Sequence, residues 1–203
     1  MNNTQTEKKK AFSTRVMVGA GMLAAVSCVL QYIEFPIPFL IPPFIKFDFS
    51  DLPALIGAFA YGPLTGVLIE LIKNLIHCAV SQSATVGELS NFILGAVFTF
   101  TAGIIYKRNK SKKTAVIGGF VGALVMAIVS IPSNYFVVYP FYYNFMPMET
   151  VLAAYQKLIP GMKSIIQCLI VFNVPFTLIK GIISVVITML IYKPLSRLLK
   201  GDN

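Results

Sequence analysis

Long apolar runs, separated by short polar or basic segments, dominate this chain. A run of about 20 apolar residues is long enough to cross a bilayer as a helix. The runs predict helices at about 13–33, 50–61, 64–80, 88–106, 114–130 and 165–192. We interpret Pro132 as the residue that breaks or ends the fifth of these helices. The expected fold class is all-α, an integral membrane bundle of six transmembrane helices that forms a single domain over residues 1–203.

Clusters of basic residues set the expected orientation of this bundle. Loops rich in lysine and arginine stay on the cytoplasmic side of a membrane. An even number of spans between successive clusters places both termini inside, with residues 1–12 as a cytoplasmic tail and 107–113 as a basic cytoplasmic loop. The clusters are Lys8–Lys10 with Arg15, the KRNKSKK segment at 107–113, and Lys193 with Arg197 and Lys200.

The composition supports a membrane protein and excludes several other classes. Of the 203 residues, 56% are hydrophobic and 12% are charged, and the mean hydropathy is +0.76. A soluble domain carries about 25% charged residues. The net charge of +9 comes largely from the flanking clusters, so it does not predict nucleic-acid binding. The three cysteines lie in apolar runs without metal-ligand spacing, which is typical of small buried hydrophobes.

The segment 46–77, KFDFSDLPALIGAFAYGPLTGVLIELIKNLIH, carries the most informative polar residues. Glu70, Lys73, Asn74 and His77 share one stripe of a helix at 3.6 residues per turn. Ionisable residues in a span are expensive and by default indicate function, so we expect this stripe to face a polar interior. Asp51, behind a Ser50 cap, is better explained by the helix dipole than by ligand contact. The single histidine is better explained by packing.

A proline-rich apolar segment, residues 34–49, precedes this region. Its four prolines prevent a regular helix, and irregular backbone is not tolerated in contact with lipid tails. The segment therefore lies at the interface or folds over a cavity. Both an outer lid loop and an ordinary interfacial loop fit the pattern.

The last predicted helix holds a second polar face, formed by Asn173, Thr177 and Lys180. A lysine at this depth must pair, reach the interface or meet a ligand. Glu70 is the natural partner of either Lys180 or Lys73. Two interpretations of Lys180 remain open: an internal ion pair that fixes helix packing, and the polar floor of a ligand pocket that also includes Asn134. The aromatic stretch 135–148 fits either an interfacial belt or the wall of a pocket for a flat ligand.

Small residues recur four apart in the first predicted helix, as Ala20 with Ala24 and Gly21 with Ala25. Such spacing lets helices approach closely in lipid. It fits packing inside this protein as well as docking to a separate membrane subunit.

Sequence motifs for catalysis are missing. The chain has no P-loop, no HExxH and no GxSxG, so we predict no enzyme, no catalytic residue, no metal site and no cofactor.

The order of motifs adds a resemblance to a known family. FPIPFLIPPFIKFDFSDLPALIGAFAYGPLTGVLIELIKNLIH, then PSNYF near residue 134 and PFTLIKG near residue 180, resemble the substrate-binding S components of energy-coupling-factor (ECF) vitamin transporters, above all the riboflavin-specific group. The resemblance implies a substrate site near the outer face of a bacterial plasma membrane. It also implies a membrane scaffold subunit and two cytoplasmic ATPases as partners.

The resemblance also implies residue roles. Riboflavin would be the transported ligand, bound with high affinity, and the small-residue face of the first helix would dock the scaffold. The expected docking residues are Ala20, Gly21, Ala24 and Ala25. The expected substrate-binding residues are Leu40, Phe44, Lys46, Glu70, Asn74, Asn134, Tyr135, Thr177 and Lys180.

One position departs from the family pattern. Thr177 stands where the family often has an asparagine, three residues before the lysine, and a hydroxyl offers one donor instead of two. Few basic residues lie on the outer side, which favours riboflavin over the phosphorylated flavin FMN. The alternatives are an S component for FMN or another vitamin, an intramembrane enzyme outside transport, and an assembly protein without a ligand.

Overall fold

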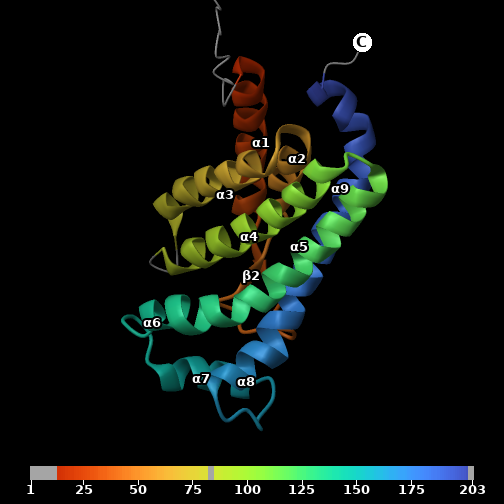
Figure 1. The fold of residues 1–203 in the computed structure, drawn as a ribbon. Helices are drawn as coiled ribbons and strands as arrows, with labels where there is room; N and C mark the ends of the chain where they lie inside the picture. Colours follow the sequence, from red (N-terminus) through yellow and green to blue (C-terminus); the bar gives the residue numbers. More distant parts are fainter. Residues whose placement is uncertain (1–12, 82–84, 201–203) are drawn as a thin grey trace, which may run out of the picture.

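The structure is a computed structural model that describes residues 13–81 and 85–200, with side chains described up to residue 191. The basic residues predicted at Lys8–Lys10, and the side chains of Lys193, Arg197 and Lys200, lie outside this part. The helical elements are α1 (Thr14–Tyr32), α2 (Asp51–Tyr61), α3 (Pro63–His77), η1 (Cys78–Val80), α4 (Val86–Arg108), α5 (Lys112–Ser133), η2 (Asn134–Val138), α6 (Tyr139–Tyr142), α7 (Met148–Gln156), α8 (Ile165–Cys168), η3 (Leu169–Asn173) and α9 (Val174–Lys200) (Figure 1).

Five helical segments of the described chain are long and apolar enough to cross a membrane. They are Thr14–Tyr32, Pro63–Val80, Val86–Arg108, Lys112–Tyr142 and Ile165–Ile191. The protein is therefore an all-α, multi-pass membrane protein.

The exception among the six predicted spans is α2. Its 11 residues extend about 16 Å, against a hydrocarbon core of about 30 Å. Gly62, with φ +111°, and Pro63 end the helix abruptly. Leu55 and Ala54 are fully buried, so α2 lies inside the protein, where it contacts α1, α3, α4 and α9.

The fifth predicted helix does not end at Pro132, which corrects the expectation from sequence. The helical path continues from α5 through η2 and α6 to Tyr142. Here η2 is a π-helical turn, and the Asn134 side chain donates to the Ser130 carbonyl at 2.7 Å. This wider turn ends two residues before Pro140, which cannot donate a backbone hydrogen bond, and it keeps the helical path continuous there. A second π-helical turn, η3, stands just before Pro175 and lets the last helix continue in the same way.

The proline-rich segment folds back over one end of the bundle. Two short strands, β1 (Phe35–Pro36) and β2 (Lys46–Phe47), pair antiparallel and are a small departure from a purely helical fold. Ile41 and Phe47 are buried in an apolar cluster with Tyr139, Tyr155 and Phe172. Irregular backbone is acceptable here because protein covers it.

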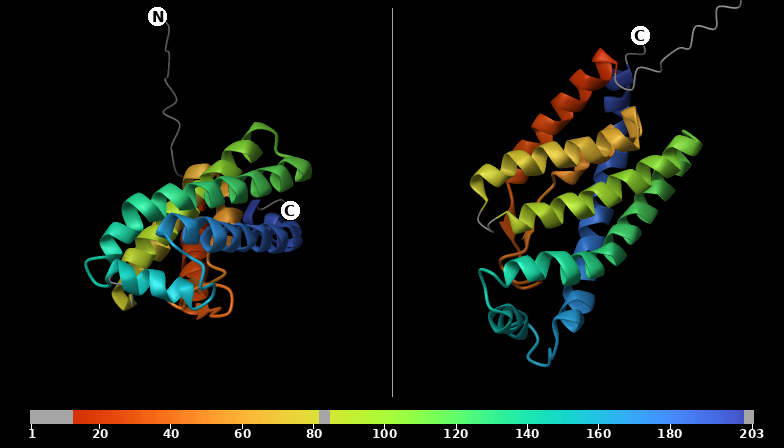
Figure 2. Two further views of the ribbon diagram at one scale, coloured as in Figure 1. Left: turned by 90° about the horizontal axis from the view of Figure 1, so that it is seen from below. Right: turned by 60° about the vertical axis from the view of Figure 1, so that its left-hand side comes forward.

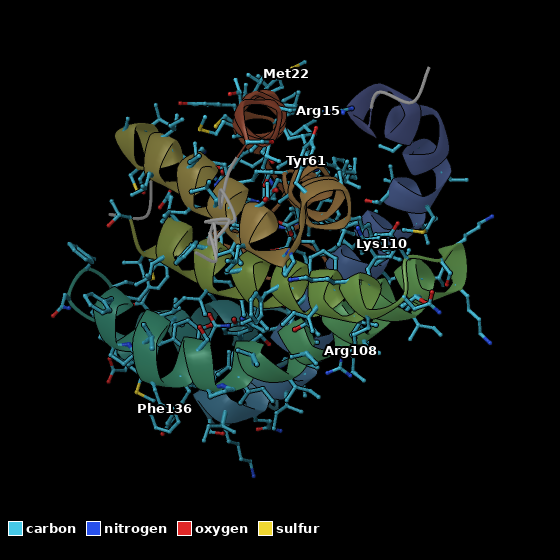
Figure 3. The ribbon with its side chains drawn as sticks, turned by 45° about the horizontal axis from the view of Figure 1, so that its top comes forward. Arg15, Met22, Tyr61, Arg108, Lys110 and Phe136 are labelled. Carbon is cyan, nitrogen blue, oxygen red and sulfur yellow. The ribbon has the colours of Figure 1, made fainter. Side chains whose placement is uncertain are left out.

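The two ends of the molecule differ in character. The start of α1, the α4–α5 turn and the end of α9 lie toward one end, and α6, α7, α8 and the short strands lie toward the other (Figures 1 and 2). Figure 3 shows Arg108 and Lys110 at the α4–α5 turn and Arg15 on α1, whereas Phe136 points outward at the opposite side. The basic residues of α1 and of the α4–α5 turn are thus separated from the folded-back loop along the bundle.

Candidate ligand-binding site

A cavity of about 320 Å³ lies beneath the folded-back loop. Its lining comes from that loop and from α1, α2, α3, α4, α5, α6 and α9, elements far apart in the sequence. The volume is within the range of small-molecule sites, about 300–1,000 Å³.

Aromatic side chains form one wall of this cavity. Phe44 of the loop lies 5.9 Å from Tyr142 and 6.2 Å from Tyr155, measured between ring centroids. Tyr139 and Phe176 also line the cavity, and Phe176 packs edge-on against Phe47. Such walls suit a flat, largely apolar ring.

A chain of hydroxyl groups supports this wall from behind. Tyr155 donates to Asn173 Oδ1 at 2.7 Å, so the 2.6 Å contact between the two tyrosine hydroxyls is a bond from Tyr139 to Tyr155. Burial raises the pKa of Tyr155 well above its usual range, which keeps this hydroxyl protonated as a donor. The chain fixes Asn173, a cavity residue, to helix α7.

Lys180 belongs to the polar part of the lining, one helical turn after Phe176, with 7% of its surface exposed. Its Nζ donates to Asp48 Oδ2 at 2.9 Å and to Asn91 Oδ1 at 3.2 Å. Asp51 Oδ2 lies 3.3 Å away as a second ion-pair partner. A buried ammonium group is tolerated only with such partners.

A second buried lysine, Lys73, extends this network away from the cavity. Its Nζ lies 2.6 Å from Asp51 Oδ1 and 2.8 Å from Glu70 Oε2, and it donates to Ser50 Oγ. Lys73 and Glu70 are both 0% exposed. Of the two partners that the sequence left open for Glu70, the structure selects Lys73, and it confirms that the stripe from Glu70 to His77 is buried.

The loop is attached to this network through Asp48. Ser50 donates to Asp48 Oδ1 through its backbone N–H at 2.8 Å and through its hydroxyl. Burial alone would raise the pKa of Asp48, but the ammonium groups of Lys180 and Lys73 hold that pKa below its usual range. Asp48 is therefore ionised and joins the end of the loop to α9.

His77 has a partner that the sequence did not suggest. Its Nδ1 lies 2.8 Å from Glu88 Oε1, and Ser81 donates to Glu88 Oε2 at 2.8 Å. His77 and Glu88 both line the cavity, so the pair joins α3 to α4 at its edge.

The structure brings five of the nine expected substrate-binding residues together around the cavity. The lining includes Phe44, Lys46, Asn134, Thr177 and Lys180. The remaining four lie outside the lining: Leu40 and Tyr135 are partly exposed, and Glu70 and Asn74 are buried. Both ends of the Asn74 side-chain amide already have partners, since the amide donates to the Glu70 carbonyl and accepts from Gln31.

Sequence reasoning missed several polar residues of the cavity. Asp48, Asn91, Glu88 and Gln31 line it, as does Asp51, which the sequence assigned to a helix start. Each is a polar residue beside or within an apolar run, and this position is the feature of the sequence that could have indicated a buried role. Their convergence depends on how the loop, α1, α2 and α4 pack together, and that packing is not visible in a linear pattern.

The small residues of α1 divide between two faces. Ala20 and Ala24 are buried, and Ala24 packs in a cluster with Leu23, Ala54 and Ile69. Gly21 and Ala25 are exposed on the outer face, and a Cβ added at Gly21 would meet nothing within 4 Å. A docking surface on α1 would therefore be formed by the second pair.

A helical membrane bundle with a partly open cavity, lined by aromatic rings and by charged and polar side chains, is a membrane protein suited to bind a small molecule. The family model for the substrate-specific component of ECF transporters matches residues 15–192. The chain belongs to this family, whose members are components of transporters and not enzymes.

Known relatives agree with this assignment. The riboflavin transporter RibU of Staphylococcus aureus is 38% identical over 184 residues, which cover 91% of this chain and 92% of the relative. The riboflavin transporter FmnP of Bacillus subtilis is 32% identical over 181 residues, or 87% of this chain and 89% of the relative. A solved structure of the S component of a bacterial ECF transporter matches with a TM-score of 0.72 and 38% identity, over 92% of this chain and 98% of that one.

Proposed function

We propose that this protein is the high-affinity riboflavin-binding subunit of an ECF-type uptake transporter in the cell membrane. The observation that carries the proposal is the cavity. Phe44, Tyr139 and Phe176 offer faces for a tricyclic ring, and Asn134, Thr177 and Lys180 offer donors for its polar edge. The two relatives described above, each matched over most of its length, are named riboflavin transporters.

Riboflavin is favoured over FMN by the charge around the cavity. The lining contains four carboxylates, Glu34, Asp48, Asp51 and Glu88, but only two lysines. Both lysines already have acidic partners, since Lys46 pairs with Glu34 and Lys180 with Asp48. A phosphate group would therefore face unbalanced negative charge in a region of low dielectric.

We further propose six passages of the chain, with both termini in the cytoplasm. The short helix α2 and its neighbour α3 would together contribute two of them. Basic residues at Arg15 and in the α4–α5 turn would then lie on the cytoplasmic side, and the cavity would open on the outer side. Loop 34–49 would act as the outer lid through Phe44 and Lys46.

For transport, we propose that the protein docks to a membrane scaffold that carries two cytoplasmic ATPase subunits. The exposed face of α1, with Gly21 and Ala25, is the proposed contact. Large apolar side chains such as Met22 and Val29 flank it on the exposed surface.

Flavin binding by the purified protein tests the ligand. The protein is purified in detergent from cells grown with riboflavin, and its visible absorption and the quenching of flavin fluorescence are recorded. We expect a yellow protein with one flavin per chain, and a large excess of FMN should be needed to displace it. A colourless protein that does not quench added riboflavin would contradict the proposed ligand, and displacement by equimolar FMN would contradict the preference.

A further inference from the structure

A second groove lies between α3, α4 and α6. Its volume is about 500 Å³, larger than that of the cavity beneath the folded-back loop. Figure 1 shows the end of α3, the start of α4 and α6 on the same side of the molecule. Leucine and phenylalanine side chains form most of the lining: Leu71, Leu75, Leu89, Phe92, Phe141 and Phe145. The groove therefore suits an apolar occupant of small-molecule size.

This groove faces the bilayer. Both α3 and α4 belong to segments that are long and apolar enough to cross a membrane. The groove extends about 10 Å along α3, from Cys78 back to Leu71. Leu75 and Phe145 are 63% and 67% exposed, so they contact lipid when the protein is in a membrane. An apolar groove does not hold water, and an empty one loses dispersion contacts, so a hydrocarbon chain fills it at the lowest free energy.

The buried polar groups of the lining already have partners inside the protein. As described above, both ends of the Asn74 amide are hydrogen-bonded. The two carboxylate oxygens of Glu88 lie 2.8 Å from His77 Nδ1 and 2.8 Å from Ser81 Oγ. A polar ligand would have to replace these bonds, whereas a hydrocarbon chain leaves them intact.

A lipid chain fits this groove better than a helix of another protein does. Close packing of helices in lipid uses small residues, and the exposed Gly21 and Ala25 lie on α1. The groove is instead flanked by large exposed side chains, Leu75, Phe141 and Phe145, which would hold a second helix away. A lipid chain is narrow and flexible, and lipid surrounds this face at high concentration.

We propose that the groove is a binding site for one acyl chain of a membrane phospholipid. The chain lies along α3 and α4, with its methyl end toward Leu71 and Phe92 and its ester end toward Cys78. Glu88 lines both the groove and the ligand cavity, so the chain packs against the wall that Glu88 forms with His77. This inference requires only a membrane and does not rest on riboflavin as the ligand.

Tryptophan fluorescence tests the site, because the chain has no tryptophan of its own. Phe92→Trp places a reporter in the lining, and Phe136→Trp places a control on an exposed position outside it. Each variant, purified in detergent, is titrated with phosphatidylcholine whose acyl chains carry bromine, which quenches tryptophan on contact. Leu75→Trp, at an exposed position of the lining, is a second reporter should Phe92→Trp fail to fold.

We expect the reporter in the groove to lose most of its fluorescence, with the loss levelling off near one lipid per chain. The control should be quenched weakly and without saturation. Equal curves for the two positions, or no quenching in the groove, would overturn the proposal.

Filling the groove is a second test. Cys78→Phe should remove the saturable quenching of Phe92→Trp, and Ile128→Phe, on an exposed position of α5 outside the lining, should leave it unchanged. Phospholipid should also raise the melting temperature of the protein without substitutions by about 2–4 °C, and that of Cys78→Phe by less. Saturable quenching that survives Cys78→Phe, or a melting temperature that phospholipid does not change, would refute the site.

Discussion

At the scale of single residues, buried charges determine which substitutions this protein tolerates. Asp48, Asp51, Glu70, Lys73 and Lys180 form one network in which each group has a counter-charge within 3.3 Å. The gain from such pairs over apolar residues is small, but removing one partner leaves the other buried and uncompensated. The network therefore fixes the packing of the loop, α2, α3 and α9 relative to one another.

Lys73→Met tests this argument away from the cavity. It leaves Asp51 and Glu70 without their common partner, and we expect a loss of about 3–5 kcal/mol of stability. The measurement is the melting temperature in detergent. Lys46→Met is the control, since its pair with Glu34 is a quarter exposed and should contribute at most about 1 kcal/mol. Equal melting temperatures for the two variants would contradict the account of the network.

At the scale of elements, close helix crossings and π-helical turns build the cavity. Gly66 of α3 lies where α2, α3 and α4 meet, and the π-helical turns place Asn134 and Asn173 on the lining. Each turn accompanies a proline that would otherwise interrupt the helix. The same local feature thus keeps the helix continuous and positions a polar side chain.

Gly66→Ala should destabilise the bundle by about 1–3 kcal/mol, the usual range for overpacking. The new Cβ would lie 2.7 Å from Ala58 Cβ and 2.9 Å from Thr99 Cβ, so α2 or α4 must move. Gly21→Ala serves as the matched control, because its Cβ would meet nothing within 4 Å. Thermal unfolding of both variants is the measurement, and an unchanged Gly66→Ala protein would show that this crossing can relax.

Tyr155→Phe tests the support that α7 gives to the aromatic wall. The change removes the hydroxyl that joins Tyr139 to Asn173 and leaves a buried amide oxygen without its donor. We expect riboflavin binding to weaken about 3- to 30-fold, as measured by fluorescence quenching. Tyr143→Phe, on a half-buried residue outside the cavity lining, is the control. Unchanged affinity for Tyr155→Phe would mean that Asn173 needs no support from α7.

At the scale of the whole molecule, binding and docking occupy different surfaces. The cavity lies at the end opposite the basic turn, whereas the exposed small residues of α1 face outward from the bundle. A substitution on the outer face of α1 can therefore reduce transport without changing ligand binding. The buried residues Ala20 and Ala24 cannot separate the two functions, because a larger side chain there would disturb the core.

Ala25→Leu should accordingly leave riboflavin binding unchanged and reduce uptake at least about 10-fold, since a bulky residue prevents close approach of a partner helix. Uptake of labelled riboflavin is measured in cells that contain the scaffold and the ATPase subunits, alongside binding by the purified variant. Ala153→Leu, on an exposed position of α7, is the matched control. Normal uptake by Ala25→Leu would place the docking surface elsewhere.

The sequence by itself determined the class of protein and most of its helices. Apolar runs and basic flanks are local features whose physical meaning does not depend on the rest of the fold. They were sufficient for a helical membrane bundle, for the buried stripe from Glu70 to His77 and, with the family motifs, for riboflavin as the expected ligand.

Only the tertiary structure decided which polar groups meet. In the structure Glu70 pairs with Lys73, and Lys180 pairs with Asp48. The fifth helical segment continues past Pro132 to Tyr142. It also separated Gly21 and Ala25 from the buried Ala20 and Ala24, although all four share one pattern. The physical reason is that burial depends on how the helices pack: Asp48 and Lys180, 132 positions apart, meet only through that packing, and it also decides which face of α1 is covered.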